Sequence, residues 1–136
     1  MSAAAELQKA IIARLLATGA VTAFLGQRIY DNPPQGSAFP FLSIGPAQEL
    51  DDSADCIDGQ EVVQQVDIWT QEGGSQLSAK EICGAVRKAL HGADLALGMG
   101  WGIVLLEVES ARYMTDPDEK IAHGVLSVRA IIEEAA

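Results

Sequence analysis

The sequence predicts an α+β fold with a mixed, mainly antiparallel four-stranded sheet and two main helices packed on it. Residues 58–70 alternate apolar and polar side chains, with Val62, Val66 and Ile68 at even spacing, which is typical of a strand with one buried and one wet face. Residues 75–90 repeat apolar side chains every three or four positions and predict an amphipathic helix that lies on this sheet. A length of 136 residues with 49% hydrophobic residues indicates a single domain over 1–136.

The N-terminal segment predicts a first helix over residues 3–17. Leu7, Ile11 and Leu15 share one helical face, and Gly19 provides a stop. Residues 20–25 favour a further short helical turn. Residues 27–36 contain Asn-Pro-Pro, which neither a helix nor a central strand accommodates, so we expect an extended arm there.

The next segment predicts the first strand, over residues 39–46, with a proline near each end where a sheet tolerates one. Residues 48–61 are rich in carboxylates, and we expect a solvated, mobile loop. This loop does not fit a calcium-binding loop that starts at Asp51, because Cys56 stands where the glycine belongs and Val62 where the bidentate glutamate belongs.

The C-terminal half predicts a long hairpin after the second helix, which ends at His91-Gly92. Residues 103–109 form the third strand and are apolar on both faces at their start, which predicts cover on both sides. Asp116-Pro117-Asp118 predicts a turn.

The last strand is expected over residues 121–132, and residues 133–136 should fray. One of its faces carries Val125, Ser127, Arg129 and Ile131 and is half apolar. This pattern indicates either an interface or a local contact with the first helix.

The charge of the chain excludes some classes of partner. Nineteen acidic against nine basic side chains give a net charge of −10, which disfavours binding to DNA by phosphate neutralisation. No apolar run is long enough to span a bilayer, and the N-terminus lacks the basic region of a signal peptide, so we expect synthesis in the cytoplasm and no membrane partner. Cys56 and Cys83 are interpreted as reduced thiols.

Motifs for catalysis, metal binding or cofactor binding are absent from the sequence. His91 and His123 have no second ligand at metal-binding spacing, and no nucleophile elbow, phosphate loop or dinucleotide fingerprint occurs. The acidic pairs are interpreted as solvated charge, and Trp69 and Trp101 as core residues or as the lining of a ligand site. The acidic pairs are Asp51 with Asp52 and Glu107 with Glu109.

Three blocks of residues together carry a family resemblance over about residues 7–132. They are Gly26-Gln27-Arg28-Ile29-Tyr30-Asp31 with Pro34, Phe39-Pro40-Phe41 and Ile44-Gly45; Asp58-Gly59-Gln60-Glu61 with Val66, Ile68-Trp69 and Gly73; and Asp116-Pro117-Asp118 with His123-Gly124-Val125 and Arg129-Ala130. In this order and spacing the chain resembles the small tail-completion, or tail terminator, proteins of long-tailed phages, prophages and phage-derived gene transfer agents.

The resemblance implies a structural protein without catalysis or cofactor. Such proteins form a ring, sixfold in the family, on the head-proximal end of a tail tube, where they end tube growth and present a docking surface to the head connector. The implied partners are further copies of the chain, the major tail tube protein and the connector or stopper protein, in the tail or neck of a virion or phage-like particle. DNA would pass through the lumen without specific binding.

Two loops are expected to project from such a ring, residues 49–58 and residues 115–120. The residues expected at the ring or tube interface are Glu49, Asp51, Asp52, Asp55, Asp58, Asp116, Asp118, Lys120 and Arg129. Two other interpretations stay open: another neck ring, either a stopper or an adaptor, and a small ligand-binding or hydrolytic domain. The second would use Trp69, Trp101, His91 or His123.

Overall fold

The fold is seen in a computed structural model, which describes residues 2–54 and 58–134. The helices are α1 (Ala3–Leu16), α2 (Gly19–Leu25) and α3 (Leu77–Leu90). The strands are β1 (Ile29–Tyr30), β2 (Phe41–Asp51), β3 (Gly59–Thr70), β4 (Trp101–Asp116) and β5 (Ile121–Glu134).

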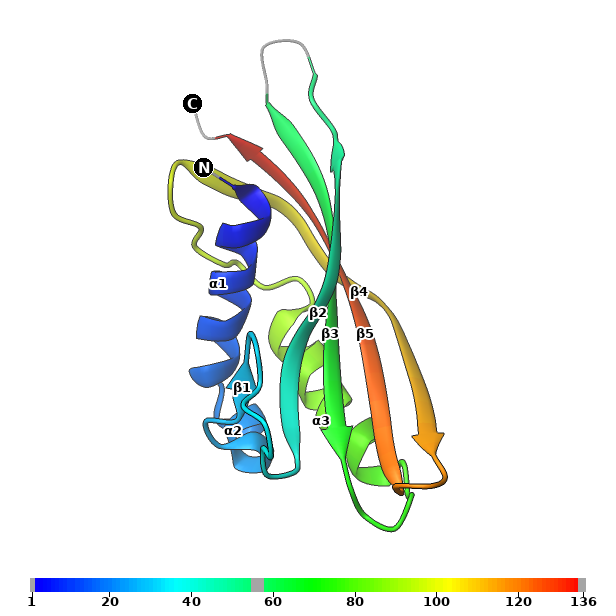
Figure 1. The fold of residues 1–136 in the computed structure, drawn as a ribbon. Coiled ribbons are helices and arrows are strands. Elements are labelled where there is room, and N and C mark those ends of the chain that lie inside the picture. Colours follow the sequence, from blue (N-terminus) through cyan, green and yellow to red (C-terminus); the bar gives the residue numbers. More distant parts are fainter. Residues whose placement is uncertain (1, 55–57, 135–136) are drawn as a thin grey trace.

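The strands form one sheet in the order β1-β2-β3-β5-β4, and α1 and α3 cover one of its faces (Figure 1). β1 runs parallel to β2, and the other neighbours are antiparallel. The predicted α+β fold with a mixed sheet is therefore confirmed. The expected count of four strands and two main helices is wrong, because part of the expected arm pairs as β1 and the short turn after the first helix is a seven-residue helix, α2.

α1 begins where Ser2 caps it, since the Ser2 hydroxyl accepts a hydrogen bond from the Ala5 N–H. Leu7, Ile11 and Leu15 have no exposed surface, as the apolar spacing predicts. Over the described residues, no single helix is long and apolar enough to cross a membrane. α1 and α2 pass that test only as a pair bent by 84°, and both bury apolar side chains in the core.

α3 packs along the middle of the sheet through the face that the sequence predicts. Its buried residues are Ala79, Ile82, Cys83, Val86, Ala89 and Leu90. They meet Leu126, Val128 and Ala130 of β5 in one hydrophobic core. The packing is tight at Gly124, where a Cβ would lie 2.6 Å from the Cys83 Sγ.

The acidic segment between the first two long strands belongs to a hairpin, and the prediction of a loop over residues 48–61 is wrong for residues 48–51 and 59–61, which are strand. β2 and β3 continue to pair from Ala47↔Gln64 to Asp51↔Gln60. Glu49, Asp51 and Glu61 lie in this two-stranded extension and are exposed or half-buried, so their charge does not oppose the strand conformation. This extension projects beyond the helices (Figure 1).

The β4–β5 hairpin confirms the predicted turn and extends both strands beyond the expected ranges. Glu133 and Glu134 pair with Gly102 and Trp101, so the expected fraying is wrong for these two residues. The expected cover on both sides of the start of β4 is also wrong: Val104 is 60% exposed, because a bulge between Ile103 and Leu105 turns it outward.

Candidate functional site

No helix of the described chain covers the second face of the sheet, which we call the open face. It carries the side chains that alternate with the buried set, including Val125, Ser127, Arg129 and Ile131 of β5. α1 lies on the other face, with Leu126 and Val128, so a local contact with the first helix does not explain the half-apolar character of this face. The open face is therefore the candidate interaction surface.

One row of side chains crosses four strands of the open face near the β4–β5 turn. Register pairs Phe41 with Trp69, Trp69 with His123, and His123 with Met114. The rings of Trp69 and His123 stack at 3.8 Å between centroids, and those of Phe41 and Trp69 at 6.3 Å. The Trp69 indole N–H donates to the Ser43 hydroxyl at 3.0 Å, which fixes the orientation of the ring.

A pocket of about 410 Å³ opens between this row and the β4–β5 turn. Its lining residues are Trp69, Met114, Thr115, Asp116, Glu119, Ile121 and His123. The structure thus brings together Trp69 and His123, two of the four residues named for a ligand site. Trp101 packs against the core instead, and His91 lies at the end of α3.

Asp67 lies beneath this row and is buried, although the strand alternation predicts a wet position. Its Oδ1 lies 2.7 Å from the His123 Nε2 and accepts a hydrogen bond from the Gln65 amide at 2.9 Å. Burial of a carboxylate requires such partners. Sequence reasoning missed the pair because Asp67 and His123 stand on strands that lie far apart in the chain.

The Asp67–His123 pair resembles two members of a hydrolytic triad. In the described part of the chain, no serine, threonine or cysteine side chain hydrogen-bonds to His123. Within the same residues, no group of three or more His, Cys, Asp or Glu side chains is placed to hold a metal ion. The hydrogen bond to Asp67 and the stack with Trp69 hold the His123 ring in a fixed orientation on the open face.

Arg129 lies in the middle of the open face between two carboxylates. Its guanidinium contacts Glu61 of β3 at 2.7 Å and Glu107 of β4 at 3.1 Å. Hydrogen bonds to Glu61 and Glu107 raise the pKa of Arg129. This predicted interface residue therefore ties three strands together within the subunit.

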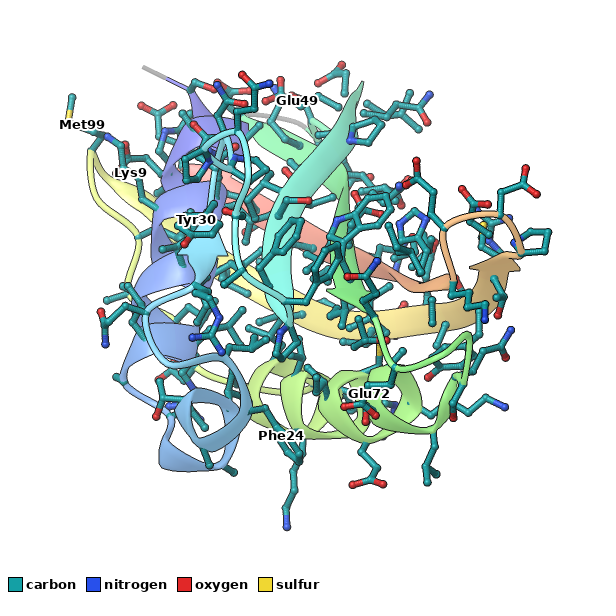
Figure 2. All side chains as sticks on the ribbon, turned by 60° about the horizontal axis from the view of Figure 1, so that its bottom comes forward. Lys9, Phe24, Tyr30, Glu49, Glu72 and Met99 are labelled. Carbon is teal, nitrogen blue, oxygen red and sulfur yellow. The ribbon has the colours of Figure 1, made fainter. Side chains whose placement is uncertain are left out.

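The acidic residues of the β2–β3 hairpin have local partners. Glu49 accepts a hydrogen bond from the Ala4 N–H at the start of α1 (Figure 2), and Asp51 accepts from the Ser53 N–H and hydroxyl. The Asp52 N–H donates to the Gly59 carbonyl, and Asp58 accepts from the Ser53 hydroxyl. Asp55 and Cys56 lie outside the described residues.

The β4–β5 turn is held by Asp116, whose Oδ1 accepts from the N–H groups of Asp118 and Glu119. Lys120 adopts a left-handed backbone with φ of 56°, which closes the turn. The predicted interface residues therefore do not form one cluster. The hairpin acids and the turn lie at opposite ends of the molecule, and Arg129 lies between them (Figure 1).

β4 is an edge strand, and His91 protects the middle of that edge. The His91 Nδ1 accepts a hydrogen bond from the Val108 N–H, and the Gly92 N–H donates to the Leu106 carbonyl. Protection of an exposed edge prevents uncontrolled strand pairing. Nothing in the sequence around His91 indicates this role, because it depends on a long-range contact.

Comparison with known proteins identifies the fold and the family. The family described as tail completion protein gp17 matches residues 9–133. No curated protein sequence matches the chain. A chain in the structure of the virion of a native gene transfer agent particle is 28% identical, with a TM-score of 0.88, and the match covers 97% of this chain and 98% of that one.

A second solved structure, the gp17 protein of bacteriophage SPP1, is 20% identical and has a TM-score of 0.64. The match covers 94% of this chain and 89% of that one, and it supports the fold alone. The family match spans nearly the whole chain and agrees with the blocks of residues that carry the resemblance. The chain belongs to the tail completion protein gp17 family.

Proposed function

We propose that residues 1–136 act as one tail-terminator-like domain, a subunit of a ring that caps the head-proximal end of a phage-like tail tube. The ring ends tube growth, joins the tail to the head connector and leaves a channel for DNA. It contains six copies, uses no cofactor and catalyses no reaction. Its partners are neighbouring copies, the major tail tube protein and the connector or stopper protein.

The observation that carries this proposal is the near full-length likeness to a chain of a gene transfer agent virion, with 28% identity and a TM-score of 0.88. The open face adds a physical argument. A ring of identical subunits needs heterologous contacts that close on themselves, and an uncovered sheet face with a partly free edge strand supplies such a surface.

The charge of the chain fits a channel for DNA. Six copies at −10 each would carry about −60 around the lumen. A surface of the same sign as DNA offers no phosphate contacts and releases no condensed counterions, so it does not hold the duplex. DNA would therefore slide through such a ring.

The β2–β3 hairpin is proposed to contact the tube or the lumen, and the β4–β5 turn a neighbouring ring. Replacing Asp51, Asp52, Asp55 and Asp58 together by Asn tests the first contact. Asn keeps a hydrogen-bond acceptor for Ser53, so the subunit should fold while tail joining or DNA passage fails. Normal particle yield and DNA delivery would exclude the hairpin from this role.

Tail length tests the role of the ring. Deletion of the gene should give overlong or unfinished tubes in electron micrographs. The alternative is another neck ring, a stopper or an adaptor, whose loss should give leaking heads and free tails of normal length. That result would assign the chain to a stopper or adaptor ring instead of a terminator ring.

A small ligand-binding or hydrolytic domain is the alternative from a different class, and the pocket beside Trp69 and His123 favours it most. Replacement of His91 and His123 by Gln, with the mass measured under native conditions, tests it. A compact monomer that loses an activity on replacement would support that alternative. A ring that assembles with both substitutions would exclude it.

A further inference from the structure

The pocket on the open face has walls of two chemical kinds. Trp69, Met114 and Ile121 provide apolar surface, and Met114 is 40% exposed. Two exposed acidic residues, Asp116 and Glu119, also line it. Asp118 adds a third acid to the same turn, and Lys120 is the one base among residues 116–120, so the turn carries a net charge of −2.

Such a pocket matches a side chain with an aliphatic stem and a cationic end. The stem of a lysine can lie on Met114 and Ile121, while its ammonium meets the carboxylates. A neutral apolar side chain would leave the carboxylates unpaired, and an acidic one would be repelled. The pocket therefore selects a basic side chain.

The outer surface of α3 carries a side-chain pair of the matching kind. Leu77 is 64% exposed, and Lys80 follows it three positions later, so the two are neighbours on the same helical face. Lys80 makes no ion pair with any residue that the structure describes, and its ammonium lies 5.6 Å from the centroid of the Tyr113 ring.

The two surfaces lie on opposite faces of the sheet at the same level. Tyr113, which Lys80 covers, faces α3, and the next residue, Met114, lines the pocket on the open face. Two complementary surfaces on opposite sides of one subunit cannot meet within it, and they join copies head to tail. Both surfaces lie at the same level along the sheet. Repeating the contact can therefore rotate each copy relative to the previous one without shifting it along the ring axis, as a closed ring requires.

We propose that Lys80 and Leu77 of one copy dock in the pocket of the next copy, with the Lys80 ammonium on the carboxylates of Glu119 and Asp116. This contact deepens the proposed ring and rests on it, and it assigns Asp116 and Glu119 of the β4–β5 turn to the next copy in the same ring in place of a neighbouring ring. Arg87 and Lys88 have no exposed large apolar residue three or four positions away on the same helix, and we place them outside the contact.

Charge exchange in producing cells tests the contact. Lys80→Glu and Glu119→Lys should each lower the yield of tailed particles about tenfold or more, because each places like charges together in the contact. The chain that carries both substitutions exchanges the two charges and should restore most of that yield. Asp31→Lys on an exposed loop and the pair Arg87→Glu with Lys88→Glu are matched controls, and both should assemble normally.

A cysteine pair gives a second measurement that needs no change of charge sign. In a Cys56→Ser background, the chain with Lys80→Cys and Glu119→Cys should form disulfide-linked chains of several copies in purified particles. Neither single cysteine variant should do so. Cys83 is buried and should not react.

The outcomes separate this contact from the ring itself. Three results would each overturn the contact and leave the proposed ring unaffected. They are normal particle yields for both single charge variants, no restoration of the yield by the double charge variant, and no disulfide link in particles that contain the cysteine pair. A wild-type chain absent from the neck of purified particles would overturn the proposed function as well.

Discussion

Gly124 of β5 is a position at which a side chain of α3 packs closely on the sheet. A Cβ at this position would be 2.6 Å from the Cys83 Sγ, a distance that real Cβ contacts essentially never show, and 3.5 Å from the Tyr113 ring. The backbone of Gly124 is not left-handed, so alanine is not excluded by its conformation. We predict that Gly124→Ala lowers the free energy of unfolding by about 1–3 kcal/mol through overpacking.

That loss should appear although Gly→Ala restricts the unfolded chain, which by itself stabilises by roughly 0.4–1 kcal/mol. Removal of the sulfur tests the cause. Cys83→Ala alone should cost about 1 kcal/mol. In the double variant the nearest neighbour of the new methyl group is the Tyr113 ring at ordinary contact distance, so the combined loss should be smaller than the sum by about 1–2 kcal/mol.

Gly84→Ala is the matched control on the outer surface of α3, where an added Cβ meets nothing within 4 Å. It should be neutral or stabilise by roughly 0.5–1 kcal/mol, because alanine is the better helix former. Urea unfolding followed by circular dichroism measures all four variants. A neutral Gly124→Ala, or losses that simply add in the double variant, would refute the close packing of α3 on β5.

Three further predictions concern the core, the turn and the open face. Burial raises the pKa of the Cys83 thiol from 9.0 to about 12. The stability contributed by the neutral thiol is therefore complete below pH 9 and is lost as the pH rises toward 12. Cys83→Ala should make the decline in the free energy of unfolding at alkaline pH shallower. Asp116→Ala removes the acceptor of two turn N–H groups and should cost about 1 kcal/mol in thermal melts, whereas Asp116→Asn keeps the acceptor and should cost less. Arg129→Gln leaves Glu61 and Glu107 unpaired and should lower the melting temperature. The difference in melting temperature from wild type should be smaller at about 0.5 M salt, because salt screens the charges. A difference in melting temperature that does not depend on salt would contradict the role of charge.

The sequence predicts those elements whose pattern is local. The spacing of Leu7, Ile11 and Leu15 predicts α1, and the stripe that contains Ile82 and Val86 predicts α3, because a repeat of three and four residues has one helical interpretation. β1 was missed for the opposite reason. Ile29–Tyr30 is a strand only through its pairing with Leu42 and Ser43, which no local pattern reports.

Charge gave the wrong prediction twice, for physical reasons. The carboxylates between β2 and β3 suggest a loop, but cross-strand pairing with Gln60 and Glu61 stabilises an exposed hairpin that charge does not oppose. The strand alternation puts Asp67 on the solvent-facing side, yet Asp67 is buried. His123 and Gln65 hydrogen-bond to its carboxylate, and Trp69 stacks on the His123 ring. Whether a polar residue on a strand is buried depends on its neighbours in space.

The candidate site could be foreseen only in part. Arg129 and the acids of the two turns are visible in the sequence, and the structure gives most of those that it describes a local partner. The pocket was foreseen only as a possible use of Trp69 and His123. Its acidic lining and the matching Leu77–Lys80 pair require knowledge of which strand faces which side.

The most direct measurement is the density of purified particles at the junction of head and tail, obtained by electron cryomicroscopy. We predict a closed ring of copies of this chain on the head-proximal end of the tail tube, with the open face of each copy against its neighbour or the lumen. A neck that lacks this chain, or holds it as a single copy, would contradict the proposal that it works by assembling with itself.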